Sequence, residues 1–238
     1  MPTKFEEVAK WGAQWVGTEA WQKHTVDEAA ANKLVAGYMR FLDKLAGTPH
    51  RQIAALGPAI DIGCGAGYIS NAFRQFGFSV VGTEYGEDTV AFARSMQPDL
   101  EIRDVDLSNF VEEGAYGFIF TREVYLFTRV GDFEQQYQVL SNLVESLRPG
   151  GVVLLVASDR LKPDCLDFAR TVEAFRADPR VASVTTPCLE PVFKHLGALI
   201  FGRASYNLLM LALAPYIALQ KWRKKWAPSL MIALVRAK

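Results

Sequence analysis

The sequence has few cysteines and no excess of charge of either sign. Its three cysteines, Cys64, Cys165 and Cys188, have spacings that fit neither a disulfide framework nor a paired-thiol metal site. This predicts a reducing, cytoplasmic setting and no metal centre. Lys plus Arg and Asp plus Glu both number 26, so the formal net charge is zero. No overall attraction to nucleic acid is expected.

Long apolar runs are also lacking. The longest uncharged stretch, residues 204–220, contains Ser205, Asn207 and Pro215. It falls short of the roughly 20 apolar residues that a membrane-spanning helix needs. The first residues are polar and soon acidic, unlike a secretory signal. Half of all residues are nevertheless apolar, so we expect a soluble protein with a sizeable core.

A helix is predicted ahead of the first strand. Thr25 and Glu28 match a capping box, and Gly47 can close the helix. Between them, apolar residues recur at near-helical spacing: Leu34, Tyr38, Leu42 and Leu45. We interpret residues 1–50 as a helical cap or lid and residues 51–238 as the main domain.

From Pro58 onward, short apolar runs alternate with helical patterns. The predicted strands are residues 59–62, 79–83, 100–103, 117–120, 152–156, 198–201 and 230–235. The predicted helices are residues 68–76, 90–96, 133–147, 166–175, 187–196 and 207–226. This alternation predicts an α/β fold with right-handed crossovers and a parallel sheet covered by helices on both faces.

The most informative segment is the glycine-rich loop of residues 61–67, where the first strand turns into a helix. A dinucleotide-binding loop would need a third glycine at position 68, but Tyr68 stands there. The carboxylate of Asp61 would repel a pyrophosphate at the helix N-terminus. The loop therefore favours a ligand that carries an ammonium group over one that carries a phosphate.

Two more acids follow at the ends of the next strands. Glu84 can accept both hydroxyls of a ribose. Asp104 can accept from an exocyclic amine while the Val105 N–H donates to a ring nitrogen, although Asp106 is a rival for this role. The three strand ends thus suit an amino acid, a ribose and an adenine.

Five segments carry a family resemblance, in this order: residues 61–67, 80–84, 103–107, 117–120 and 147–151. Together they resemble the class I S-adenosylmethionine-dependent methyltransferases, in particular the small-molecule branch that includes quinone-ring methylases. The likeness runs from about residue 58 to 156 and continues more weakly to the C-terminus. It implies a Rossmann-like, doubly wound sheet of seven mostly parallel strands with an antiparallel last strand.

The resemblance also implies S-adenosyl-L-methionine as cofactor and S-adenosyl-L-homocysteine as product. It implies these cofactor contacts: Asp61, Gly63, Cys64 and Gly65 at the methionine part, Glu84 at the ribose, Tyr85, Asp104 and Val105 at the adenine, and Thr121 and Arg122 near the sulfonium. Family members often have serine or threonine two residues after the acid that holds the ribose, where this chain has Gly86.

The residues that would bind the methyl acceptor are less clearly marked in the sequence. His24, Glu123 and Tyr125 are candidates for a base that takes a proton from the acceptor. His24 is equally consistent with an exposed residue beside a helix cap, and Tyr125 with packing of a helix face. Aromatic residues of the N-terminal segment suit either an amphipathic helix or a lid over the substrate: Phe5, Trp11, Trp15 and Trp21.

The segment 204–226 is predicted as a hydrophobic helical insertion and has two interpretations. Its basic and tryptophan-rich end, residues 221–226, is typical of a helix on a membrane surface. Alternatively, its apolar face packs on the sheet or on a partner subunit, in a monomer or homodimer. The protein is accordingly expected in the cytoplasm, with peripheral membrane contact as the second interpretation.

The predicted function is methyl transfer to a small-molecule acceptor, with oxygen or nitrogen favoured over carbon. Because a sulfonium is already a good leaving group, catalysis would rest on proximity and orientation. The alternatives are a membrane-associated methyltransferase acting on a lipid or quinone, and a non-catalytic module that binds a nucleotide cofactor.

Overall fold

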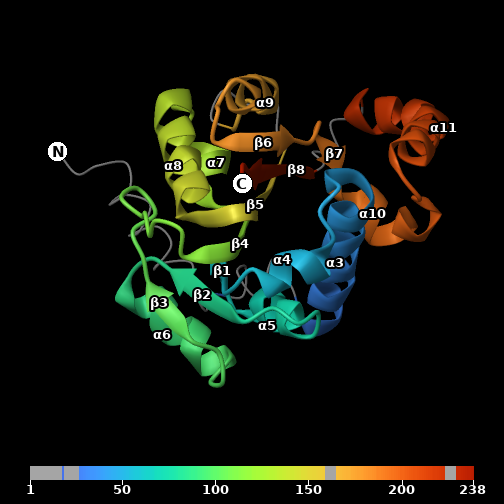
Figure 1. The fold of residues 1–238 in the computed structure, drawn as a ribbon. Helices are drawn as coiled ribbons and strands as arrows, with labels where there is room; N and C mark the ends of the chain where they lie inside the picture. Colours follow the sequence, from blue (N-terminus) through green and yellow to red (C-terminus); the bar gives the residue numbers. More distant parts are fainter. Residues whose placement is uncertain (1–17, 19–26, 159–164, 223–228) are drawn as a thin grey trace.

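The computed structural model describes residue 18 and residues 27–158, 165–222 and 229–238. One mixed sheet lies at its centre (Figure 1). The strands are β1 (Ala59–Ile62), β2 (Val80–Glu84), β3 (Ile102–Asp104), β4 (Tyr116–Arg122), β5 (Leu147–Ser158), β6 (Val181–Val184), β7 (Cys188–Leu189) and β8 (Ser229–Arg236). The α-helices are α3 (Glu28–Phe41), α4 (His50–Ala55), α5 (Tyr68–Arg74), α6 (Glu87–Met96), α7 (Tyr125–Arg129), α8 (Phe133–Ser146), α9 (Phe168–Arg176), α10 (Glu190–Leu196) and α11 (Arg203–Trp222). A π-helix, η1 (Leu42–Ala46), extends α3, and a 3-10 helix, η2 (Gly197–Leu199), follows α10.

The sheet is doubly wound. Its strand order is β3-β2-β1-β4-β5-β8-β6, with β7 also paired to β8. The strands β1 to β5 pair in parallel, and β8 runs antiparallel to β5, β6 and β7. The predicted α/β class, with an antiparallel last strand, is confirmed. Strand order reverses between β1 and β4, and ligands of open α/β sheets bind at such a reversal, beyond the carboxyl ends of the strands.

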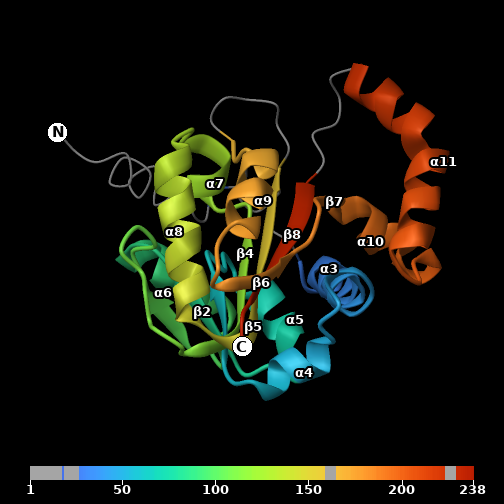
Figure 2. The same ribbon diagram turned by 45° about the horizontal axis from the view of Figure 1, so that its top comes forward.

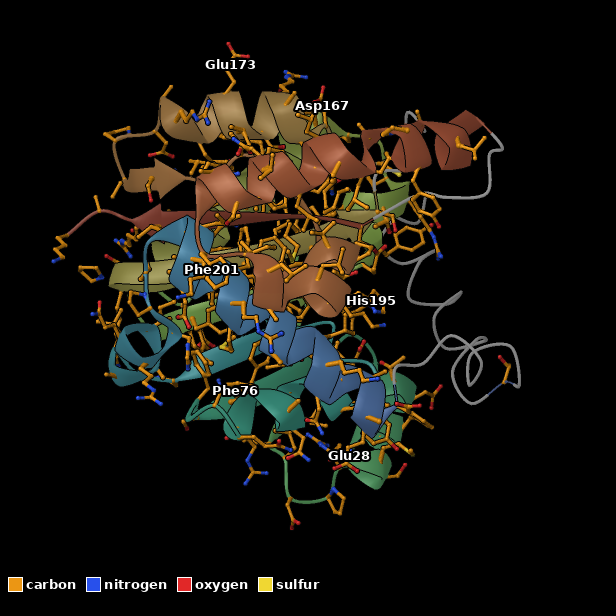
Figure 3. All side chains as sticks on the ribbon, turned by 90° about the vertical axis from the view of Figure 1, so that its right-hand side faces the viewer. Glu28, Phe76, Asp167, Glu173, His195 and Phe201 are labelled. Atoms are coloured by element: carbon orange, nitrogen blue, oxygen red, sulfur yellow. The ribbon has the colours of Figure 1, made fainter. Side chains whose placement is uncertain are left out.

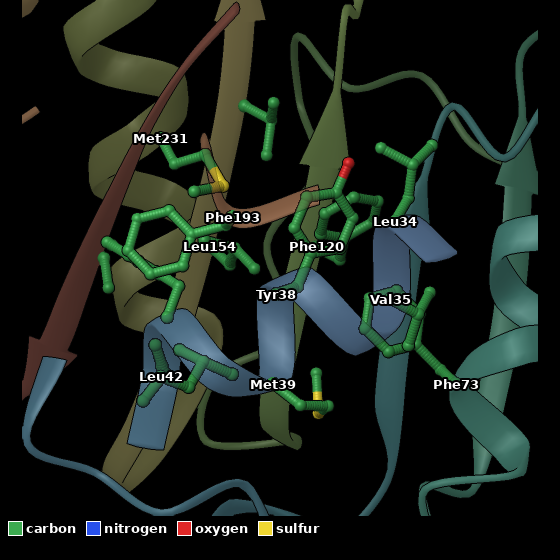
Figure 4. Packing of buried hydrophobic residues seen from close by; sticks show 14 of the residues in the cluster. Leu34, Val35, Tyr38, Met39, Leu42, Phe73, Phe120, Leu154, Phe193 and Met231 are labelled. Carbon is green, nitrogen blue, oxygen red and sulfur yellow. The ribbon is translucent and has the colours of Figure 1, made fainter. Parts of the chain in front are cut away.

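Helices cover both faces of the sheet (Figure 2). Along β5, Val152, Leu154 and Val156 join a core with α3, α5 and α10, whereas Val153 and Leu155 join a second core with α7, α8 and α9. This alternation is the period of a strand buried on both sides. Figure 4 shows the first core, in which Tyr38 of α3 lies beside Phe120 of β4.

The helix ahead of the sheet begins at Asp27 rather than at a capping box. The Asp27 carboxylate accepts the N–H of Ala30 at 2.7 Å and caps α3. Gly47 closes the helix with φ of 71°, as predicted. Thr25, His24 and the aromatic residues of the N-terminal segment lie outside the described residues, so the lid remains a prediction. The described part of the cap, α3, is buried on the sheet face through Val35 and Tyr38.

The predicted strand at residues 198–201 is wrong. The chain forms η2 there, and the Phe201 side chain is 78% exposed. Ser205 accepts the N–H groups of Phe201 and Gly202 at 2.8 and 3.1 Å, so these backbone donors start α11 instead of joining a ladder. β8 lies between β5 and β6 (Val181–Val184), and β6 was not predicted.

Candidate functional site

The carboxyl ends of four strands meet at one edge of the sheet. In the strand registers, Ile62 of β1 pairs with Thr83 of β2 and with Thr121 of β4, while Glu84 pairs directly with Asp104 of β3. The residues that the sequence analysis selected at these strand ends are therefore neighbours in space.

The glycine loop after β1 turns with left-handed backbone at Gly63 and Gly65, whose φ angles are 71° and 59°. A Cβ at Gly63 would lie 2.8 Å from Val124 Cγ2, whereas a Cβ at Gly65 would meet nothing within 4 Å. Space is therefore left open beside Gly65, at the reversal of strand order. The Gly65 N–H donates to the Glu84 carboxylate at 2.5 Å, which ties the loop to β2.

Asp61 is buried at the end of β1. Its side chain is close to fully buried and accepts the Ser70 hydroxyl at 2.6 Å. Burial, with a smaller contribution from the nearby Glu84 carboxylate, raises the pKa of Asp61 from its ordinary 3.8 to about 7. Ser70, on α5, was missed by the sequence analysis, and its only signal was a polar residue among the apolar residues of this helix, such as Phe73.

Glu84 is the second acid of the edge. Burial raises the pKa of its carboxyl, although backbone N–H donors at Gly65 and Tyr85 oppose the shift. Tyr85, half-buried, follows it directly in the loop before α6. Two carboxyl groups, Asp61 and Glu84, thus resist ionisation at this edge, and a bound cation would relieve both.

Asp104 and Asp106 differ in what they do. Asp106 accepts from the N–H and hydroxyl of Ser108 at 2.9 and 2.6 Å, so it is used within its own turn. Asp104 is exposed and accepts the N–H of Gly86 at 3.0 Å. This contact joins β3 to the start of α6, where Gly86 has φ of 93°. The geometry favours Asp104 over its rival as the ligand-facing acid.

The Val105 N–H is engaged in the sheet. It donates to the Glu84 carbonyl oxygen at 2.9 Å, as a continuation of the β2–β3 ladder. The expectation that this N–H is available to a ring nitrogen is therefore not met in this structure. The Val105 side chain is half-buried against the second core.

Cys64 hydrogen-bonds to β2 through its backbone, and its side chain packs beneath the loop. Its N–H donates to the Thr83 carbonyl at 2.8 Å, and its sulfur packs on Gly82, where an added Cβ would lie 2.9 Å from Sγ. Burial raises the pKa of the thiol well above its ordinary value. Cys64 is consequently a protonated packing residue beneath the loop.

Thr121, at the end of β4, carries an unsatisfied hydroxyl. The residue is fully buried, and its Oγ1 has no hydrogen-bond partner in the described part of the chain. A buried polar atom without a partner is destabilising by about 1 to 3 kcal/mol. Thr121 lies beside Ile62 of β1, at the carboxyl edge of the sheet.

Arg122 belongs to a buried polar cluster. It donates to the Glu190 carboxylate at 3.0 Å and to the Tyr38 hydroxyl at 3.1 Å, and the Tyr38 hydroxyl also donates to Glu190. Burial alone would lower the pKa of Arg122, but Tyr38 and Glu190 raise it above its ordinary value. Burial and Glu190 raise the pKa of Tyr38. Arg122 was expected near the sulfonium, and Glu190 was not predicted because no local pattern marks it.

Glu123 has an unusual backbone. It is the one described non-glycine residue with positive φ, 54°. Its two carboxylate oxygens accept the hydroxyls of Ser158 of β5 and Ser229 of β8, each at 2.6 Å. Strain of this kind persists where the surrounding structure holds the residue, and it concentrates at functional sites.

Tyr125, the remaining described acceptor candidate, begins α7. It packs partly on the second core, and the Arg129 guanidinium lies 5.4 Å from its ring centroid. Glu123 and Tyr125 thus both follow β4 at the same edge as the glycine loop. Within residues 27–158, 165–222 and 229–238, no group of three metal-binding side chains is assembled.

Comparison with known proteins supports this arrangement. Residues 60–155 match the family model described as "Methyltransferase domain". A probable S-adenosylmethionine-dependent methyltransferase of Mycolicibacterium smegmatis is 30% identical over 102 residues, which cover 43% of this chain and 38% of that protein. An N,N-dimethyltransferase of Streptomyces venezuelae that acts on dTDP-3-amino-3,4,6-trideoxy-alpha-D-glucopyranose is 30% identical over 100 residues, covering 40% of each.

The chain thus spans about two fifths of the length of these curated relatives. The similarity of fold covers a larger part of the chain than the similarity of sequence. The solved structure of the plantazolicin methyltransferase BpumL in complex with SAH has 16% sequence identity and a TM-score of 0.57, covering 99% of this chain and 97% of that chain.

Proposed function

We propose that the chain transfers a methyl group from S-adenosyl-L-methionine to a small-molecule acceptor, because residues 60–155 match a family model of methyltransferase domains. The observation that carries the proposal is the open space at Gly65, at the strand ends that hold the buried Asp61 and the half-buried Glu84.

The described residues fit this cofactor. S-adenosylmethionine carries an ammonium, which suits the buried carboxyl group of Asp61, and two ribose hydroxyls, which suit the carboxyl group of Glu84. A ligand beside Gly65 would occupy space that a side chain at this position would fill. The unpaired hydroxyl of Thr121 supplies a further polar contact.

We assign roles along the edge as follows. Asp61 would bind the ammonium, with Ser70 orienting its carboxylate. Glu84 would accept the ribose hydroxyls while the Gly65 N–H holds it in place. Asp104 would accept from the adenine amine, with Tyr85 beside the ring. Arg122 would stay neutralised by Glu190, so its charge would not oppose the sulfonium.

The cofactor would supply a methyl group on a positively charged sulfur, which needs no nucleophile from the protein. The chain's own task would be to place the acceptor in line with that methyl and to exclude water. Glu123, fixed by Ser158 and Ser229, is the described residue best placed to take a proton from an acceptor. Tyr125 would line the acceptor side.

We infer that oxygen or nitrogen is the acceptor atom. The amino-sugar specificity of the Streptomyces venezuelae relative supports nitrogen as one option. A carboxylate held in place by two hydroxyls suits an acceptor that arrives with a positive charge.

Calorimetric titration with S-adenosylhomocysteine tests the proposal most directly. We expect binding at one site per chain, followed by transfer of a labelled methyl group from S-adenosylmethionine to a metabolite fraction. Binding of NAD in place of S-adenosylhomocysteine would contradict the proposal and favour an oxidoreductase.

A further inference from the structure

The helix α11 (Arg203–Trp222) lies at the outer edge of the molecule, beyond α10 (Figures 1 and 2). Figure 3 views the molecule from the side that α10 and α11 cover. From residue 204 to 220 this helix has no charged residue. A helix that is apolar all round is expected inside a large core or against a membrane.

One face of α11 packs on the protein. Tyr206 is buried, and Leu209, Met210, Leu213 and Ile217 are half-buried against the core that contains α3 and α10. Residues at this spacing share one side of a helix. This face explains why α11 is held to the domain.

The opposite face of α11 is also apolar but is exposed to solvent. We define the outward face as Leu208, Leu211, Ala212, Pro215 and Leu219, which recur at helical spacing. Leu208 is 70% exposed and Leu211 72%. Contiguous apolar surface of this kind marks sites of contact with a membrane or another protein.

Further exposed apolar residues precede α11. Leu199 of η2 and Phe201 are 57% and 78% exposed. Both lie just before the first turn of α11, so exposed apolar side chains occur on either side of the start of this helix.

The charge and composition of the segment that follows the uncharged stretch indicate what binds this face. In the sequence, the uncharged stretch is followed by a group of basic residues with two tryptophans among them: Lys221, Trp222, Arg223, Lys224, Lys225 and Trp226. Basic residues attract anionic headgroups, and tryptophan favours the boundary between acyl chains and water. An interface between two copies would instead favour a polar rim with charges of both signs.

The helix would lie on the bilayer and not cross it. In the described part of the chain no single helix meets the length and hydropathy of a span, and α11 does so only jointly with α10, across a bend of 114°. Val192 and Phe193 of α10 are buried in the core, so α10 is not available to enter lipid.

We propose that the outward face of α11 docks this protein onto the surface of an anionic lipid bilayer. The proposal does not depend on the methyl-transfer reaction. It would bring the carboxyl edge of the sheet within reach of acceptors that dissolve in or at the membrane.

The test is co-sedimentation of the full chain with vesicles of phosphatidylcholine alone and of phosphatidylcholine with phosphatidylglycerol. We expect the chain to sediment with the anionic vesicles and to do so less as salt is raised. The variant Leu208→Gln/Leu211→Gln should reduce the partition coefficient at least about tenfold, because each leucine loses its burial in lipid.

A matched control is Met96→Gln/Val111→Gln, which removes two apolar side chains that are 39% and 50% exposed elsewhere. It should bind vesicles like the wild type. The proposal fails if the wild type does not sediment with anionic vesicles or if the control loses binding equally. It also fails if the chain self-associates without binding vesicles and the α11 variant abolishes that association, since a second copy would then cover the face.

S-adenosylhomocysteine affinity, measured in the same three proteins, separates this proposal from the proposed function. It should be unchanged in both variants. Absence of cofactor binding in all three would contradict the proposed function and leave the docking result standing.

Discussion

The carboxyl edge of the sheet and the outward face of α11 are opposite kinds of surface. At the edge, the buried Asp61 and the half-buried Glu84 are acids whose pKa values are raised by burial. On α11, Leu208 and Leu211 are apolar groups left in water. We propose that each surface binds a different class of molecule: the carboxyl edge would bind S-adenosylmethionine, and the outward face of α11 would bind lipid.

Substitution of Gly65 should have the largest effect on the edge. Gly65→Leu places a side chain in the open space, so we expect affinity for S-adenosylhomocysteine to fall about 100-fold or more, about 2.7 kcal/mol. Gly114→Leu is the matched control, because Gly114 has φ of 61° and also no atom within 4 Å of an added Cβ. Both variants should lose roughly 1 to 2 kcal/mol of stability from left-handed strain.

Calorimetry should separate the two glycine variants. Only Gly65→Leu should lose cofactor affinity. Equal affinity in both variants would show that the space beside Gly65 is not the binding site, and the contrast between the edge and α11 would then lose its basis.

The second prediction concerns Asp61 and pH. The unfolded chain releases this proton near pH 4, whereas the folded chain holds it to about pH 7. The folded state thus binds more protons in this window, so the free energy of unfolding falls as pH rises from 4 to 7. Asp61→Asn should remove this fall, so its advantage in stability over the ligand-free wild type should grow by roughly 2 to 3 kcal/mol between pH 5 and pH 8.

Urea denaturation at pH 5 and pH 8 checks this prediction. At pH 5 the variant should already be the more stable protein, by a smaller amount, because the unfolded wild type has lost most of its Asp61 proton there. With S-adenosylhomocysteine added at pH 8 the order should reverse, because the ammonium favours the ionised carboxylate. A wild type that shows no loss of stability between the two pH values would contradict the assignment.

Glu84 supplies the third prediction. Glu84→Ala should weaken S-adenosylhomocysteine binding by about 1.5 to 3 kcal/mol, because it removes charge-assisted hydrogen bonds to the ribose. Glu84→Gln keeps an acceptor for the Gly65 N–H and should lose less. An analogue without the two ribose hydroxyls should be insensitive to either substitution, and an equal loss with that analogue would place the ribose elsewhere.

The smallest effect is expected at the adenine end. Asp104→Ala should weaken binding by about 0.5 to 1.5 kcal/mol, the range for a single hydrogen bond. Asp106→Ala should leave affinity unchanged, since Asp106 serves Ser108 within its own turn. The reverse result, measured by the same titration, would exchange the roles of the two acids.

The parts of the fold that could be predicted from the sequence are those with strong periodicity. The predicted β1, β2 and β8 lie within one residue of the observed strands because apolar runs and glycine turns define them locally. β6 (Val181–Val184) was missed because it is short and half exposed. Residues 198–201 form an apolar run that was wrongly predicted as a strand. An apolar run alone does not show which segment pairs with β8, and in the structure β6 and β7 do so.

The same division applies to the site. Asp61, Glu84 and Asp104 could be predicted because parallel strands bring their carboxyl ends to one edge. The partners of Arg122 could not, since Glu190 lies 68 residues later and Tyr38 84 residues earlier. The same holds for Ser158 and Ser229, which reach Glu123 from two other strands.

The contact among Arg122, Glu190 and Tyr38 also bears on how the protein can be divided. Residues 60–155 carry the methyltransferase match, but a fragment with those ends would lose Glu190, the counter-charge of Arg122, together with the helices α3 and α10 that cover one face of the sheet. Side chains that those helices bury, such as Phe120 and Leu154, would then meet water, at about 1.5 to 3 kcal/mol each, against the 5 to 15 kcal/mol typical of a whole domain. We therefore expect that the cofactor-binding segment does not fold without helices from both ends of the chain.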